Sequence, residues 1–213
     1  MHIGDPMPQL INSLCSDRSI CKIGLIDSEY SHAVKAVNSA LKTFGLQREF
    51  ENKMIKTPTS IPEWSSGDLY DVNFTRMMII EDLMEQRSIY ICNLNDAWHS
   101  MLLRISNELE CSIFLLISSP VQADKFEYNQ MIVKFESGEI RRTIHTYFDE
   151  GWKFIESGLP LPGEDKFVKK NVLKRLRMDR SSIWNIAKFN MGSSDFNIRF
   201  GRCTEWNRIT ESR

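Results

Sequence analysis

The sequence predicts a single α/β domain, of the α+β kind, in which helices pack on a mixed sheet. Three observations support this fold class. Strand-like apolar runs alternate with amphipathic helical stretches, a strand–helix–strand series spans 88–119, and an antiparallel meander is indicated over 127–156. The 213 residues are enough for one full core, and no linker-like stretch divides them. Residues 1–213 are therefore expected to form one domain.

The first predicted unit is a strand followed by a helix. The apolar run CKIGLI occupies 21–26, and Asp27 and Ser28 follow at a position where helices commonly start. Gly45 stands where a helix C-terminal glycine belongs. The stretch between carries apolar side chains at helical spacing: Tyr30, Ala33, Val34, Val37, Ala40, Leu41 and Phe44.

The stretch that follows is harder to interpret. Within 46–75, the run IPEWSSGD (61–68) predicts a loop because it is rich in Pro, Gly and Ser. The next run, TRMMIIEDLMEQ (75–86), fits a helix, and it also fits a buried strand followed by a turn. Both interpretations stay open at this point.

The second predicted unit is a parallel crossover over 88–119. The runs SIYICNL (88–94) and SIFLLISS (112–119) predict strands, and the continuous apolar character of the second indicates burial on both faces. Parallel strands need a crossover connection, which is usually a helix. The stretch between the two runs has the stripe of such a helix: Trp98, Met101, Leu102, Ile105 and Leu109.

A β-hairpin is predicted around Ser137 and Gly138. The runs EYNQMIVKF and EIRRTIHTYF flank this pair of turn residues. With Phe135 opposite Ile140, one face carries Met131, Val133, Phe135, Ile140 and Ile144. The other face then carries Lys134 opposite Arg141, with Glu136 and Glu139 diagonal to them.

The meander continues into a third strand and then gives way to helices. A turn at 149–151 leads to WKFIE (152–156), which predicts a strand with Trp152 and Phe154 on one face, as part of the core. The run KFVKKNVLKRLR (166–177) predicts a basic amphipathic helix. A second short helix, capped by Ser181 or Ser182, runs through Ile183, Trp184, Ala187 and Phe189, and FNIRF (196–200) predicts an edge strand.

Composition and charge exclude several classes of protein. No apolar run approaches the roughly 20 residues that span a bilayer, and the first residues lack the pattern of a secretory signal, so a cytoplasmic protein is expected. An odd number of scattered cysteines predicts reduced thiols rather than disulfides, and no metal site or cofactor is expected. These cysteines are Cys15, Cys21, Cys92, Cys111 and Cys203.

The charge is distributed unevenly along the chain. Residues 1–120 hold 10 Lys and Arg against 15 Asp and Glu, whereas the rest of the chain has a positive balance.

The sequence holds no recognisable catalytic motif. The nucleophile elbow GxSxG, the zinc motif HExxH, the P-loop and the dinucleotide glycine fingerprint are all absent. His99 and His145 have no nucleophile in a recognisable arrangement, and we expect them to be ordinary surface or core residues. The chain is therefore not expected to be an enzyme. Nucleic-acid binding through the basic residues of 166–180 stays open as an alternative function.

The run from 88 through the hairpin to 165 resembles immunity proteins of bacterial polymorphic-toxin and contact-dependent growth inhibition systems. The resemblance covers roughly residues 88–177. Those chains often show a helix with an early Trp, a hairpin with a short Gly turn, and then a pattern of the form Asp-turn–W–F–x–x–G–x–x–LP–x–E. The matching positions here are Trp98, Asp149, Trp152, Phe154, Gly158, Leu161, Pro162 and Glu164. Gly163 stands where an aromatic residue frequently follows the LP pair.

The resemblance implies a function without turnover. Immunity proteins bind a cognate toxin domain, commonly a nuclease, and cover or distort its active site. Because toxins that handle phosphate tend to be basic, acidic surface is what a blocking partner would present. The resemblance therefore implies a toxin-binding role for the carboxylates of 148–165: Asp149, Glu150, Glu156, Glu164 and Asp165.

Overall fold

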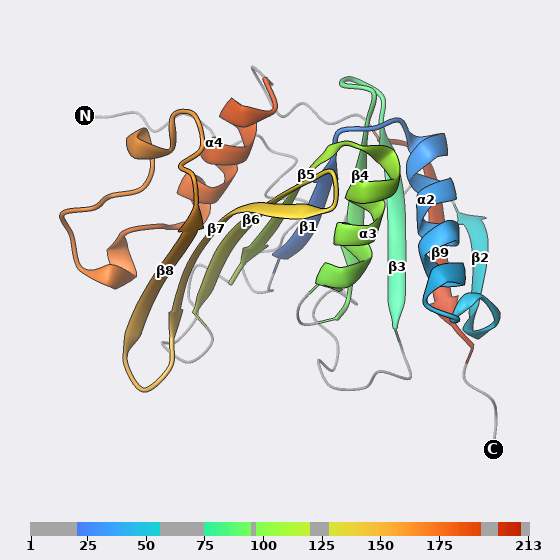
Figure 1. Cartoon of the computed structure of the whole chain (residues 1–213), viewed down its shortest axis with the longest axis horizontal. Helices are drawn as coiled ribbons and strands as arrows, with labels where there is room; N and C mark the ends of the chain where they lie inside the picture. Colours follow the sequence, from blue (N-terminus) through green and yellow to red (C-terminus); the bar gives the residue numbers. More distant parts are fainter. Residues whose placement is uncertain (1–20, 56–74, 95–96, 120–127, 193–199, 210–213) are drawn as a thin grey trace.

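The computed structural model describes residues 21–55, 75–94, 97–119, 128–192 and 200–209 (Figure 1). Its elements in chain order are β1 (Cys21–Ile26), α2 (Tyr30–Thr43), η1 (Gln47–Glu49), β2 (Phe50–Ile55), β3 (Arg76–Asp82), β4 (Arg87–Cys92), α3 (His99–Leu109), β5 (Ser112–Ser118), β6 (Asn129–Glu136), β7 (Glu139–Phe148), β8 (Trp152–Gly158), η4 (Glu164–Lys166), η5 (Lys174–Leu176), α4 (Arg180–Asn190) and β9 (Phe200–Arg208).

The strands of the described residues form one nine-stranded sheet in the order β2-β9-β3-β4-β1-β5-β6-β7-β8. Every hydrogen-bonded strand pair in this sheet is antiparallel. The expected mixed sheet is therefore wrong, and the protein is built on an antiparallel sheet with helices on its faces.

The expected parallel crossover over 88–119 is wrong because a third strand lies between its two strands. β1 pairs antiparallel with β4 on one side and with β5 on the other, so that Ile23 is opposite both Ile91 and Leu116. Strand β1 is as apolar as its neighbours, and the middle of the sheet buries it on both faces. The helix α3 connects two strands that are two positions apart in the sheet rather than hydrogen-bonded neighbours.

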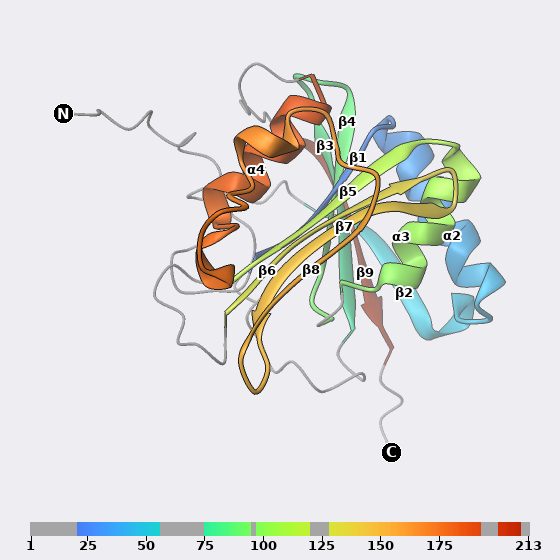
Figure 2. The same cartoon turned by 60° about the vertical axis from the view of Figure 1, so that its left-hand side comes forward.

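The sheet separates two hydrophobic cores (Figure 2). One face is covered by α2 and α3, and the other by α4 and the segment that follows β8. Alternation along β5 illustrates how a central strand serves both cores. Phe114 and Leu116 pack toward α4, whereas Ile113, Leu115 and Ile117 pack toward α2 and α3. A strand of this kind has to be apolar at every position, which explains the continuous run SIFLLIS.

The predicted hairpin is confirmed, including the pairing of Phe135 with Ile140. Ser137 and Gly138 both have positive φ angles, of 48° and 81°, as a two-residue type I′ turn requires. The expected pairing of Lys134 with Arg141 is wrong, because the register shifts between Lys134 and Phe135 and Lys134 lies opposite Arg142.

This β-bulge changes which side chains share a face. Met131, Val133 and Phe135 share one face as predicted, and this face packs on the α3 side. Ile144, which was expected on the same face, is buried on the α4 side, and Ile140 is 54% exposed. A bulge redirects the side chains that follow it. Here it turns Arg142 toward the α4 side of the sheet.

Several other predictions are confirmed. The strand at 21–26 and the helix that follows it are formed, and 149–151 turns into β8. Of the two interpretations left open for 75–86, the structure shows the strand, β3, followed by a turn. The C-terminal strand, however, begins at Phe200 and lies between β2 and β3 rather than at an edge, and 196–199 lie outside the described residues. The strand β2 at the sheet edge was not predicted.

The predicted basic helix over 166–177 is wrong. The segment contains only the short 3-10 turns η4 and η5. Of its expected apolar stripe, Val168 is buried, but Val172 and Leu176 are 37% and 53% exposed. The β-branched residues of this segment and Asn171 have low helix propensity. The described part of the fold also offers no surface that would bury all three residues of the expected apolar stripe.

Gly158 at the end of β8 is expected to tolerate no side chain. Its φ angle is +81°, and a Cβ atom there would lie 1.9 Å from the carbonyl oxygen of Arg141. Gly158→Ala should lower the free energy of unfolding by more than about 2 kcal/mol, since backbone strain and a backbone clash add. Gly45→Ala is the matched control, because Gly45 has a φ angle of +73° but open space around it. If urea unfolding showed equal losses of unfolding free energy in the two variants, the close contact at Gly158 would be contradicted.

Candidate functional site

The five carboxylates predicted to bind a partner do not form one surface. Asp149 and Glu150 are exposed in the turn between β7 and β8. Glu156 and Glu164 meet at Arg142 near the other end of β8, and Asp165 is exposed beside Glu164. The two groups are roughly 20 Å apart along the strand. Their role in binding stays a prediction, but they cannot all contact one small patch.

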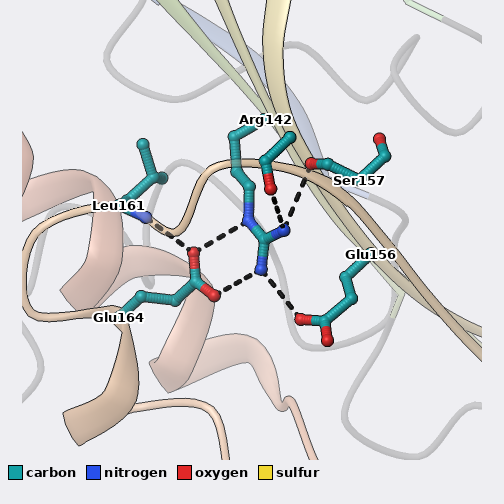
Figure 3. Close-up of polar contacts among 6 residues, drawn as sticks. Arg142, Glu156, Ser157, Leu161 and Glu164 are labelled. Carbon is teal, nitrogen blue, oxygen red and sulfur yellow. Dashed lines mark hydrogen bonds and ion pairs between the residues drawn. The ribbon is translucent and has the colours of Figure 1, made fainter.

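Arg142 and Glu164 form a buried, bidentate ion pair (Figure 3). The side chains are 3% and 2% exposed. The Nε of Arg142 donates to Oε2 of Glu164 at 3.0 Å, and its Nη2 donates to Oε1 at 2.5 Å. Such two-point hydrogen bonding between guanidinium and carboxylate is the strong form of an ion pair.

The remaining hydrogen-bonding groups of this pair are also satisfied. Nη1 of Arg142 donates to the carbonyl oxygens of Ser157 and Gly158 at 3.2 and 2.9 Å, and Nη2 donates to Glu156 at 2.8 Å. Glu164 also accepts a hydrogen bond from the backbone N–H of Leu161 at 2.9 Å. These contacts tie β7 and β8 to the segment that follows them.

The electrostatics of this cluster indicate a structural role. Burial opposes the charge of Arg142, but hydrogen bonds to Glu164 and Glu156 outweigh it and raise the pKa of the guanidinium above its ordinary range. Glu164 is therefore a neutralising partner inside the protein and is not available to an external one. The sequence could not reveal this, because the bulge that turns Arg142 toward Glu164 has no sequence signature.

An open groove of about 440 Å³ lies beside β8. We call it the β8 groove. Its lining is apolar at Tyr128, Trp152, Val172 and Leu176 and charged at Lys169, Arg175 and Asp179. Most of its lining residues belong to the segment that follows β8, which is drawn in orange in Figure 1.

Aromatic side chains form one wall of the β8 groove. Trp152 packs edge-to-face against Tyr128 and Phe148, with ring centroids 5.2 and 5.5 Å apart. Trp152 and Phe154 point to the same face as predicted, but both are only partly buried rather than full core residues. The ring of Trp152 therefore supports the fold and also lines a space open to solvent.

The opposite wall belongs to residues 169–177, which we call the basic loop. The N–H of Lys169 donates to the carbonyl of Arg177 at 2.9 Å and closes the loop at its base. The Tyr128 hydroxyl donates to the carbonyls of Met178 and Arg175, at 2.9 and 3.3 Å. Burial, with the charge of Asp179, raises the pKa of Tyr128 to about 12, so the hydroxyl keeps the proton that it donates.

The basic loop exposes apolar and cationic side chains together. Leu173 is 66% exposed, next to the exposed Val172 and Leu176 of the groove wall. No carboxylate of the described residues forms an ion pair with Lys170, Lys174 or Arg175. An exposed apolar patch with a polar rim is typical of interaction surfaces.

Asp179 is the one carboxylate of the groove lining, and it is also the N-cap of α4. Its Oδ1 accepts hydrogen bonds from the N–H and hydroxyl of Ser182 and from the hydroxyl of Ser181, all within 2.8 Å. Burial opposes the charge of Asp179, but these bonds lower its pKa overall. The predicted caps, Ser181 and Ser182, are thus donors to the real cap.

His99 and His145 lie on the face of the sheet that α2 and α3 cover. Nε2 of His145 is 2.9 Å from Oδ1 of Asn129, and its ring stacks on Tyr147. Burial, with the nearby His99, lowers the pKa of His145 to about 4, so the imidazole is neutral at physiological pH. The ring of His99 packs against Phe135.

The described ranges contain no group of three or more His, Cys, Asp and Glu side chains that could hold a metal ion. Among their helices, none has the length and apolar character needed to cross a bilayer. Comparisons with protein-family models, with curated proteins and with solved structures found no match.

The β8 groove was not predicted from the sequence as a site. The sequence predicts Trp152 as part of the core and 166–177 as a basic amphipathic helix. The available signal was the run KKNVLKRL (169–176), in which apolar residues stand among cations. Its residues are exposed throughout. Without a helix, the apolar side chains of this run stay at the surface.

Glu164 and Asp165 are adjacent in the chain but should differ sharply in their contribution to stability. Glu164→Ala leaves the buried Arg142 without its main partner and should lower the free energy of unfolding by about 3–5 kcal/mol. Asp165→Ala changes an exposed side chain and should alter it by less than about 0.5 kcal/mol. Urea unfolding of the two variants measures the difference. A stable Glu164→Ala variant would show that the buried pair does not hold this part of the fold.

Proposed function

We propose that this chain is an immunity protein that binds and neutralises a cognate toxin domain without catalysis. The observation that carries the proposal is the β8 groove, an open apolar cavity with cations on its rim. It lies within the part of the chain that resembles immunity proteins, and Trp152 of the resemblance pattern forms its wall.

The chemistry of the groove fits a protein partner. Trp, Tyr and Arg are the residue types that contribute most often to binding energy at protein interfaces, and Trp152, Tyr128 and Arg175 line this groove. The wall is anchored to a large sheet, and the basic loop is held by the hydroxyl of Tyr128. A site that is ordered before binding loses less entropy when a partner docks.

The acidic turn adjoins the same surface. Glu150 and Asp149 precede Trp152 by two and three residues and are exposed. In the proposed complex they contact basic residues of the toxin, which the resemblance implies is commonly a nuclease, and they mainly accelerate association. The complex would form in the cytoplasm, where such toxins act.

Nucleic-acid binding through the cations of 166–180 is the alternative. The irregular basic loop presents Lys169, Lys170, Lys174 and Arg175 at the surface, so these side chains could contact phosphates. The edge-to-face packing of Trp152 on Tyr128, however, leaves less free ring face for stacking bases. A protein partner accounts better for the apolar wall.

Co-expression tests the proposed function. We expect a neighbouring reading frame to encode a larger protein with a toxic C-terminal domain. This domain should stop growth when produced alone, and co-expression of this chain should restore growth. An unrelated toxin of similar potency is the control, and the chain should give no protection from it. Absence of protection from the neighbouring toxin, with the chain folded and well expressed, would reject the proposal.

A further inference from the structure

The interior of the β8 groove is suited to an apolar side chain. Its apolar lining consists of the Trp152 and Tyr128 rings and the side chains of Val172 and Leu176. Val172 and Leu176 are 37% and 53% exposed. Burying such surface against another apolar group is favourable in proportion to the area covered. A volume of about 440 Å³ is within the range of pockets that enclose a compact ligand.

The rim of the groove favours a negatively charged partner. Lys169 and Arg175 line the groove, and Lys170 and Lys174 flank them on the basic loop. Two neighbouring cations already have aromatic contacts: the guanidinium of Arg177 lies 4.9 Å from the ring centre of Phe154, and Nζ of Lys166 lies 5.1 Å from that of Phe189. Lys170, Lys174 and Arg175 differ from Arg177 and Lys166 because they have no such aromatic contact among the described residues.

The one carboxylate of the lining, Asp179, offsets only part of this charge, and the cation it interacts with is Lys169. Asp179 accepts three hydrogen bonds at the start of α4, and these hold its carboxylate at the helix N-terminus. A carboxylate supplied from outside would meet free donors of Lys170, Lys174 and Arg175 instead. Charge complementarity of this kind directs which partner docks and how fast.

We infer that the β8 groove receives an acidic segment of a partner protein, and that one large apolar side chain of this segment packs against the apolar lining of the groove. The inference rests on the proposed function in taking a protein as the partner, and it adds the chemistry of the part that docks. It also assigns separate tasks: the apolar anchor provides burial, and the cations of the basic loop select the acidic segment. A single-stranded nucleic acid is the competing occupant.

Fluorescence anisotropy with defined probes tests the inference on the full chain. The main probe is a short labelled peptide of Asp, Glu, Gly and Ser residues with one central Leu. Matched probes replace this Leu with Ser, replace the acidic residues with Lys, or consist of oligo-dT. The acidic Leu peptide should bind at least about tenfold more tightly than each matched probe.

Groove variants locate the binding. Leu176→Ser and the double variant Lys174→Glu/Arg175→Glu should each weaken binding of the acidic Leu peptide at least about tenfold. These side chains are exposed, so the melting temperature should change little. Arg48→Glu, at an exposed position of η1 near the opposite edge of the sheet, is the matched charge-reversal control and should leave binding unchanged.

Each other result would overturn the inference. Equal binding of the Leu and Ser peptides would show that no apolar anchor is used. Unchanged binding by the groove variants would show that the peptide binds elsewhere. Failure of the acidic Leu peptide to bind, or tighter binding of oligo-dT, would reject the acidic segment. Growth protection is measured separately. If the chain protects cells but does not bind the acidic Leu peptide, the proposed function stands and this inference is rejected.

Discussion

The buried ion pair between Arg142 and Glu164 is the contact on which this end of the structure depends. The guanidinium joins β7, the end of β8 and the turn at η4, and its hydrogen bonds are satisfied by two carboxylates and two backbone carbonyls. A buried charge of this kind is costly unless it is fully paired. The ion pair therefore anchors the chain where it leaves β8, at Leu161 and Glu164.

The basic loop takes its position from this anchor and from a second one. Glu164 holds the start of the segment, Val168 and Met178 are buried against the sheet, and Tyr128 binds the carbonyls at the far end of the loop. Between these anchors the chain has no helix to bury its apolar residues. Exposed Leu and Val side chains therefore lie beside the cations Lys170, Lys174 and Arg175, and an apolar surface with a polar rim is typical of interfaces.

Local elements were predictable from the sequence, whereas their arrangement was not. The Ser137–Gly138 turn and the helix before Gly45 follow from residue chemistry, and both are formed. The position of β1 between β4 and β5 depends on long-range pairing among equally apolar strands, which local patterns do not encode. The bulge at Arg141 also lacks a signature, so Glu164 was assigned to the surface. The basic loop was assigned to a helix because its periodicity fits one, although no surface buries that stripe.

Hydrogen exchange of the Arg142→Met variant tests most directly whether the buried pair positions the groove. Met keeps an apolar side chain of similar length but removes the charge and the hydrogen bonds. The account predicts faster exchange of the hydrogen-bonded amides of Val168, Lys169 and Leu176, with β1 and β5 as protected as in the wild type. Unchanged exchange throughout 161–178 would show that the basic loop and the β8 groove are held without the ion pair.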